Sequence, residues 1–148
     1  VRYSFLQRGS DERQYNSPGI DLPIASLSRT KYGEYPEYHT SLDNFNVVTK
    51  KGLQGGINVV KKAVNIIMKN YIPKYQVLAE PQMGRRGLYP MLSVKKKDKI
   101  SRNFMNFLQF ADGTNDLIDI SNYIKLSFDE TFEICEVLKN KKLIKKQN

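Results

Sequence analysis

The alternation of apolar and polar side chains changes character along the chain. Residues 1–6 alternate apolar and polar positions, which predicts a half-buried strand. In residues 20–28 the apolar side chains of Leu22, Ile24 and Leu27 surround Pro23, which predicts a second short strand that is irregular or lies at a sheet edge. Segments 8–19 and 29–44 are rich in turn-forming residues and are predicted to be long loops. Long loops that follow strands are typical of the carboxyl edge of an α/β enzyme.

Helical spacing replaces this alternation further on. Ile57, Val60 and Val64 begin an apolar stripe that predicts a helix over residues 57–69, although two glycines just before it leave its start open. Because proline cannot continue a helix, Pro73 sets the end. The stretch that follows, residues 73–94, holds three of the six prolines of the chain. We therefore expect it to be a connector that packs against neighbouring elements.

The last third is predicted to form three short helices and a strand. Ser101 is a candidate N-cap for the first helix, and residues 117–124 form the second. Ser127 with Glu130 three residues later makes a capping-box pattern at the start of the third helix. Residues 141–146 are predicted to form a final short strand. This order predicts a winged-helix-like, tri-helical domain.

Composition narrows the classes of protein that the chain can belong to. It has 148 residues, 40% of them hydrophobic, so it can bury a core, and it has no apolar run of membrane-spanning length. One Cys cannot form an internal disulfide, which is compatible with the cytoplasm, the predicted compartment. One His and one Cys also cannot build a self-contained structural zinc site, which takes about four such ligands.

The net charge of +9 raises the question of nucleic-acid binding. The excess is spread over both halves of the chain, which fits a solvated basic surface as well as an anion-binding patch. The third predicted helix of the tail carries four carboxylates, at Asp129, Glu130, Glu133 and Glu136. Like charges would repel DNA there, so a structural or protein-contact role is favoured over nucleic-acid binding. Cys135, on the inner face, is interpreted as a small buried hydrophobe.

The lone histidine lies in the second long loop, in the segment Tyr38-His39-Thr40-Ser41-Leu42-Asp43-Asn44. Taken alone, His39 reads either as a hydrogen-bonded loop histidine or as a metal ligand. Asp43, four positions later, could orient the imidazole or could cap the next helix, and the spacing does not decide between these roles. The tyrosines at positions 32, 35 and 38 fit loop packing better than substrate stacking.

That segment, preceded by Gly-Ser-Asp-Glu-Arg-Gln-Tyr-Asn-Ser-Pro-Gly-Ile-Asp-Leu-Pro at positions 9–23, resembles the C-terminal end of co-catalytic zinc aminopeptidases. The resemblance is to the bacterial aminopeptidase-like proteins linked to polysaccharide biosynthesis, which end in a winged-helix domain. Residues 81–90 and the tail extend it over essentially the whole chain. It implies that His39 coordinates one of two zinc ions and that Asp43 lies behind it. Glu12 stands where many such peptidases have His, so no ligand role is carried over to it.

The resemblance also implies a fold and a domain order. Residues 1–72 would be the C-terminal portion of a mixed-sheet α/β/α zinc-peptidase domain, residues 73–94 a connector, and residues 95–148 the winged-helix-like domain. The chain does not begin like a natural N-terminus, so we expect it to be part of a longer polypeptide. The other zinc ligands and the general base are then expected upstream.

The first loop is implied to form part of the active-site wall and to bind substrate. Arg13 could hold a substrate carboxylate with two hydrogen bonds, or Asp11 and Arg13 could simply pair in solvent. The residues implied to face the cleft are Asp11, Glu12, Arg13, Gln14 and Tyr15.

The expected function of the intact protein is zinc-dependent hydrolysis of a peptide or amide bond. The expected partners are the upstream part of the polypeptide and a small peptide or amide substrate. The sequence leaves open whether the protein forms a homo-oligomer. The alternative is a catalytically degenerate protein whose winged-helix domain binds protein or nucleic acid.

Overall fold

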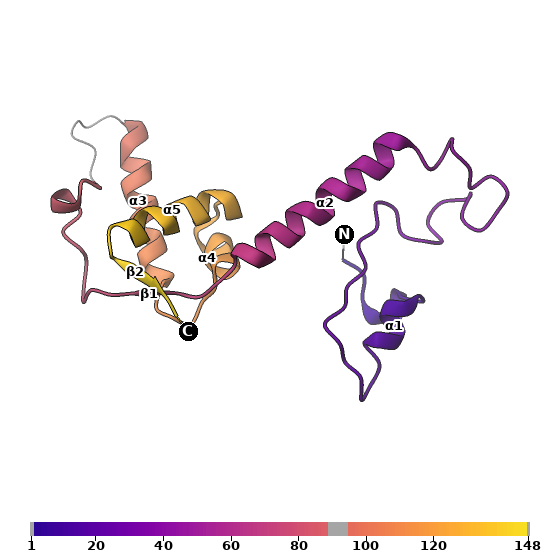
Figure 1. Ribbon diagram of the computed structural model, residues 1–148, viewed down its shortest axis with the longest axis horizontal. Coiled ribbons are helices and arrows are strands. Elements are labelled where there is room, and N and C mark those ends of the chain that lie inside the picture. The colour runs from indigo at the N-terminus through magenta and orange to yellow at the C-terminus, as the bar shows by residue number, and fades with distance from the viewer. Residues whose placement is uncertain (1, 89–94, 148) are drawn as a thin grey trace. The chain divides into compact units, whose positions relative to one another are not determined.

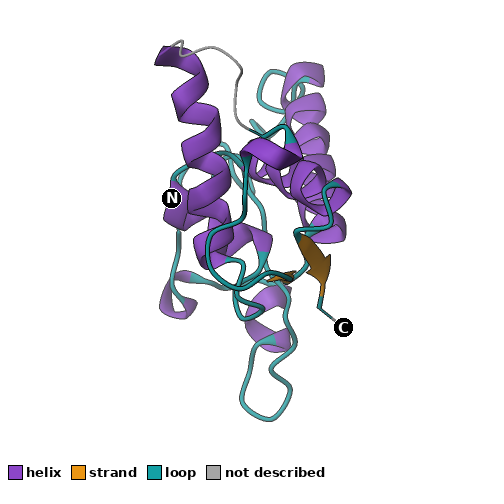
Figure 2. Ribbon diagram, turned by 90° about the vertical axis from the view of Figure 1, so that its left-hand side faces the viewer, coloured by secondary structure: helices purple, strands orange, loops and turns teal. Residues whose placement is uncertain are grey.

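The computed structural model describes residues 2–88 and 95–147. These residues form helices joined by loops, together with a two-stranded sheet (Figures 1 and 2). The chain divides into two compact units, Val1–Lys62 and Ala63–Asn148, called unit 1 and unit 2 below. The boundary falls inside helix α2, Lys50–Lys69.

Unit 1 differs from the prediction at both expected strands. Phe5–Gln7 forms a turn of 3-10 helix, η1, and residues 20–28 have no regular secondary structure. A strand needs a neighbour that satisfies its backbone N–H and C=O groups, and the described residues of unit 1 offer no such neighbour. The two predicted strands are therefore wrong, and the mixed α/β/α sheet expected over residues 1–72 is not confirmed.

A short helix, α1, occupies Asp11–Tyr15, inside the segment predicted to be a loop. Asp11 and Glu12 lie in its first turn, where carboxylates interact favourably with the helix dipole. Asn16 closes the last turn, because its side-chain nitrogen donates to the Glu12 carbonyl at 2.6 Å. Sequence reasoning recognised the turn-forming residues here but missed that they frame a single helical turn.

Helix α2 begins seven residues before the predicted start at residue 57. Thr49 explains the difference, because its side-chain oxygen accepts from the Gly52 N–H at 3.0 Å and its carbonyl accepts from the Leu53 N–H at 2.9 Å. These contacts are those of an N-cap residue. Among the described residues, no helix is long and apolar enough to cross a membrane, α2 included.

The described part of unit 1 has no apolar core. Its apolar side chains are exposed or half-buried, and its one buried residue is Glu12, with 5% of its surface exposed. Leu6 is 84% exposed and Phe45 is 90% exposed. The apolar stripe of α2 is exposed as well. Burial of apolar surface is the main force that holds a domain together, so unit 1 lacks the usual source of stability.

Unit 2 contains the three helices predicted for the tail: α3 (Lys95–Phe110), α4 (Leu117–Ile124) and α5 (Phe128–Asn140). The capping box of α5 is confirmed: the Ser127 side chain accepts from the Glu130 N–H, and Glu130 accepts from the Ser127 N–H at 2.9 Å. Ser101 is not an N-cap, because α3 starts six residues earlier, at Lys95. It is buried, and its hydroxyl donates to the Leu88 carbonyl at 3.4 Å.

The predicted C-terminal strand is shorter than expected and pairs with the predicted connector. Strand β2 (Ile144–Lys146) runs antiparallel to β1 (Pro73–Tyr75), with Tyr75 opposite Ile144. Met83 and Leu88, also from the predicted connector, are buried in the core of unit 2. Residues 89–94 of that connector, including part of the 81–90 motif, lie outside the described residues.

The core of unit 2 fills the space between its helices and its sheet. Besides Cys135, six apolar side chains of its described part have no exposed surface: Phe107, Ala111, Leu117, Ile120, Leu138 and Leu143. Cys135 is fully buried beside them, and its sulfur lies 3.1 Å from the Tyr71 hydroxyl. Burial raises the pKa of the Cys135 thiol to about 11, so the thiol is protonated and behaves as the small hydrophobe predicted.

Candidate functional site

His39 lies on the surface of unit 1, in a turn with backbone φ of 59°. This left-handed conformation is uncommon for residues other than glycine, but histidine adopts it more readily than most. The imidazole stacks on the Tyr38 ring, with the ring centroids 4.0 Å apart and the planes at 19°. In the described part of the chain, no hydrogen bond reaches the imidazole. Both ring nitrogens are therefore free to bind a ligand.

The tyrosines of this loop form the support on which His39 rests. Tyr38 contacts Tyr35 edge-on at 5.6 Å and Tyr32 at 6.1 Å between centroids. Thr40 holds the turn after His39, because its hydroxyl donates to the Glu37 carbonyl at 2.8 Å. The predicted packing role of the tyrosines agrees with these contacts. The tyrosine rings and the Thr40 hydrogen bond together hold His39 in its position.

Asp43 follows in the same turn, and its N–H donates to the Thr40 carbonyl at 3.1 Å. Its side chain lines a cleft of about 460 Å³ together with Arg29, Tyr35 and Glu37. Burial is the largest cause of the raised pKa of the Tyr35 hydroxyl, and the Asp43 charge adds to it. His39 does not line this cleft, and no hydrogen bond joins Asp43 to the imidazole in the described residues. The role of Asp43 behind a metal ligand stays a prediction.

The five residues predicted to bind substrate form α1, and Glu12 among them lines a cleft. The Tyr32 hydroxyl donates to Glu12 Oε1 at 3.3 Å and accepts from the Gly9 N–H at 2.5 Å. Arg13 turns away, because its Nη1 donates to the Arg8 carbonyl at 3.0 Å and its guanidinium lies 4.9 Å from the centre of the Phe5 ring. Asp11, Gln14 and Tyr15 are exposed.

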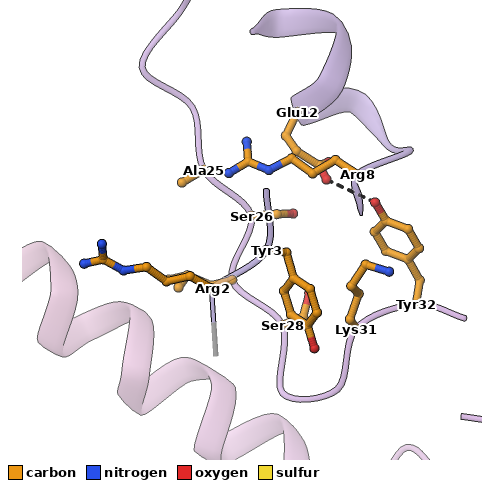
Figure 3. A pocket seen from close by; sticks show the side chains of 10 residues that line it. Arg2, Tyr3, Arg8, Glu12, Ala25, Ser26, Ser28, Lys31 and Tyr32 are labelled. Atoms are coloured by element: carbon orange, nitrogen blue, oxygen red, sulfur yellow. Dashed lines mark hydrogen bonds between the residues drawn. The ribbon is translucent and has the colours of Figure 1, made fainter. Parts of the chain in front are cut away.

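Glu12 lines a second cleft of about 460 Å³, which we call the basic cleft (Figure 3). Three cationic side chains and two tyrosines surround it, and the loop at residues 25–28 forms one wall. Sequence reasoning missed these cations, since they come from separate segments with no local motif. Its lining residues are Arg2, Tyr3, Arg8, Glu12, Ala25, Ser26, Leu27, Ser28, Lys31 and Tyr32.

Metal-binding capacity within the described residues is limited. No group of three or more His, Cys, Asp or Glu side chains is close enough there to hold a metal ion. His39 is therefore a single candidate ligand, which would need further ligands from outside the residues that the structure describes.

Helix α5 presents its acidic residues to solvent in unit 2. Asp129, Glu130 and Glu133 are exposed, and Glu136 is half-buried, with a carboxylate oxygen 3.3 Å from Lys139 Nζ. Hydrogen bonds from Ser127 lower the pKa of the Glu130 carboxyl, so it is ionised well below neutral pH. The second helix of the α4–α5 pair, the one that would enter a major groove, thus carries negative charge.

Three helices packed on a two-stranded sheet are the architecture of a winged helix, and the family comparison agrees. A family model described as winged helix-turn-helix matches residues 70–146, and the chain belongs to this family. A second model, described as a domain of unknown function (DUF4910), matches residues 1–70. The two matches meet at residue 70, near the C-terminal end of α2.

Comparisons with Clostridium acetobutylicum proteins extend over most of the chain. A curated relative named "Putative polysaccharide biosynthesis protein with aminopeptidase-like domain" is 36% identical over 95% of this chain. A crystal structure described as a "putative peptidase" matches 95% of this chain with a TM-score of 0.80 and 32% identity. The chain spans 33% of the length of the curated relative and 30% of the solved chain. The resemblance to aminopeptidase-like proteins of polysaccharide biosynthesis is confirmed.

Proposed function

We propose that this chain is part of a zinc-dependent aminopeptidase-like hydrolase that cleaves a peptide or amide bond. The observation that carries the proposal is the 36% identity over 95% of the chain to a protein with an aminopeptidase-like domain. The likeness to a solved peptidase-type structure, which extends over the same share of the chain, supports it. The chain spans only a third of the curated relative, so the activity proposed is that of the whole protein.

His39 suits the role of one zinc ligand in such a site. Its imidazole is exposed, free of hydrogen bonds in the described residues, and held from one side by the Tyr38 ring. Neutral imidazole nitrogen is a common zinc ligand. A fixed ring loses little conformational freedom when it binds a metal, which favours binding. The chemistry of the residue therefore fits the metal, while the number of candidate ligands in the described residues does not complete a site.

Zinc bound by His39 and by ligands from the rest of the polypeptide would polarise the scissile carbonyl and provide hydroxide at neutral pH. We propose two zinc ions in the complete site. This chain is proposed to hold one nitrogen ligand, the imidazole of His39, in place and to form a wall beside it. The general base is proposed to come from the rest of the polypeptide, since no residue here can be assigned that role.

The exposed apolar residues of unit 1 support its place in a larger domain. The described part of unit 1 buries no apolar side chain, yet it carries Leu6, Phe45 and Ile57 at its surface. Exposed apolar area of this kind is stabilised when another protein surface covers it. We propose that the aminopeptidase-like remainder of the polypeptide is that surface.

The winged-helix part is proposed to contact protein rather than DNA. The carboxylates on α5 are the observation that favours this role, because phosphate groups and carboxylates repel each other. A DNA titration across salt concentrations tests the choice. Binding that weakens steeply with salt would favour the nucleic-acid alternative, and no measurable binding would favour protein contact.

The zinc content of the protein at its full natural length tests the role of His39. We expect His39→Ala to lose about one of two bound zinc ions per site and to lose hydrolysis of an aminoacyl p-nitroanilide. Asp43→Asn should weaken zinc affinity by about 10–100-fold if Asp43 supports the ligand. Metal content is measured by mass spectrometry after dialysis, and activity by release of nitroaniline.

Glu37→Gln is the matched control, because Glu37 lies in the same loop and is two residues from the ligand. It should keep both zinc and activity. Unchanged zinc content and activity in His39→Ala would overturn the ligand assignment. Bound zinc without any hydrolase activity in the unmodified protein would favour the catalytically degenerate alternative.

A further inference from the structure

The basic cleft of unit 1 has an imbalance of charge. Arg2, Arg8 and Lys31 contribute three positive charges to its lining, against one negative charge from Glu12. Cations gathered around one concave surface raise the local concentration of anions. A cleft of about 460 Å³ lies within the size range of small-molecule sites, roughly 300–1,000 Å³.

Two of the three cations are half-buried and have no ion-pair partner among the described residues. Arg8 and Lys31 are both partly shielded from solvent, and neither has a carboxylate oxygen within 4.0 Å in that part of the chain. Partial burial of an unpaired charge is unfavourable, so an anion that binds beside Arg8 and Lys31 would remove part of this cost. Figure 3 shows the Arg8 side chain extending across the cleft toward Ala25 and Ser26.

Glu12 offsets only one of the three positive charges of this cleft, and its carboxylate accepts a hydrogen bond from a tyrosine. The Tyr32 hydroxyl donates to Glu12 Oε1 at 3.3 Å (Figure 3). The same hydroxyl accepts from the Gly9 N–H at 2.5 Å. This chain of hydrogen bonds fixes the Tyr32 ring and the Glu12 side chain at one edge of the cleft. The lining therefore keeps an excess of positive charge, and Arg8 and Lys31 can meet a bound anion.

Lys31 is positioned by the rings of two tyrosines. Its Nζ lies 5.3 Å from the centre of the Tyr3 ring and 4.9 Å from the centre of the Tyr32 ring. Tyr3 is held in turn, because its hydroxyl donates to Glu34 Oε2 at 2.7 Å, which raises the pKa of that hydroxyl. Cation–π contacts orient the ammonium group without neutralising its charge. Lys31 is thus placed to meet an anion.

We propose that the basic cleft binds an anionic group of a small molecule, a carboxylate or a phosphoryl group, through Arg8 and Lys31. This differs from the sequence-based expectation, in which Arg13 holds the carboxylate. Arg13 instead donates to the Arg8 carbonyl at 3.0 Å and is not among the residues that line the cleft. That the anion belongs to the substrate rests on the proposed hydrolase function, whereas anion binding itself does not.

Calorimetric titration of the full-length, metal-free protein at fixed ionic strength tests the cleft. The probes are inorganic phosphate, acetate, and neutral acetamide. We expect saturable binding of phosphate or acetate and none of acetamide. Saturation by phosphate alone assigns a phosphoryl group, saturation by acetate alone assigns a carboxylate, and either result supports the site. Absence of saturable binding by both anions overturns it.

Variants locate the binding. Arg8→Gln and Lys31→Gln should each weaken anion binding by about tenfold or more, a change of about 1.4 kcal/mol. Arg85→Gln and Lys61→Gln are matched controls, because both side chains are exposed and line none of the clefts described above. Equal weakening in the controls would mean that general surface charge attracts the anion and would overturn the proposal.

Two measurements guard against a folding defect and separate this proposal from the hydrolase. Arg8→Lys keeps the charge and should retain most of the binding, and circular dichroism checks that each variant is folded. Anion binding in a protein without hydrolase activity would refute the proposed function alone. Hydrolysis without anion binding would refute the proposed cleft alone.

Discussion

Units 1 and 2 use their apolar residues in opposite ways. Unit 2 buries Phe107, Leu138 and their neighbours completely, whereas the described part of unit 1 buries one residue, and that residue is the carboxylate Glu12. Unit 2 thus has the core that a small domain needs, while the candidate chemistry of the chain lies in unit 1 on loops without a core. The candidate site and the stable scaffold are therefore separate parts of this chain.

The largest expected effect concerns folding of the separate parts. A fragment of residues 63–148 should fold alone, because its core is complete within itself, and a fragment of residues 1–62 should not. Amide proton NMR spectra and hydrogen exchange measure this directly. A dispersed spectrum from residues 1–62 alone would show that unit 1 folds without a core and would contradict this contrast.

A matched pair of leucine substitutions tests the same contrast within the 148-residue chain, because one leucine is buried in unit 2 and the other is exposed in unit 1. Leu138→Ala removes a side chain with no exposed surface and should lower the free energy of unfolding by about 2–5 kcal/mol. Leu27→Ala removes a side chain that is 64% exposed and should change it by less than about 0.5 kcal/mol. Urea denaturation followed by circular dichroism gives both values. A large effect of Leu27→Ala would show that unit 1 has a core after all.

Two serines at helix starts provide the smallest contrast. Ser127 caps α5 through its side chain, so Ser127→Ala should cost about 1 kcal/mol of stability. Ser10 precedes α1 but makes no side-chain cap hydrogen bond, so Ser10→Ala should leave the free energy of unfolding nearly unchanged. Thermal unfolding of both variants measures the difference. Equal losses would contradict the assignment of the caps.

Sequence reasoning succeeded where local signals and burial agree. The capping box at Ser127, the helix at 117–124 and the buried Cys135 were all predicted, because unit 2 supplies the tertiary contacts that its periodicity implies. It failed for residues 1–6 and 20–28, where alternation suggested strands. Alternation only describes a face that could be buried, and a strand also needs a partner for its backbone.

The candidate site shows the same limit. His39 could be singled out from its motif, but the exposed ring stacked on Tyr38 and the left-handed backbone are visible only in the structure. Arg8 and Lys31 could not be found from the sequence, because they are 23 residues apart and no motif joins them. Arg13, which the resemblance implied to bind substrate, bonds to the Arg8 carbonyl and does not line the basic cleft.

The sequence by itself determined the helices of the tail, the winged-helix class and the likeness to aminopeptidase-like proteins. These depend on periodicity, caps and motifs, which are local properties of the chain. The tertiary structure decided which residues share a cleft, which charges lack a partner, and which unit has a core. Those properties depend on contacts between distant segments, and the free energy of such contacts has no signature in any short stretch of sequence.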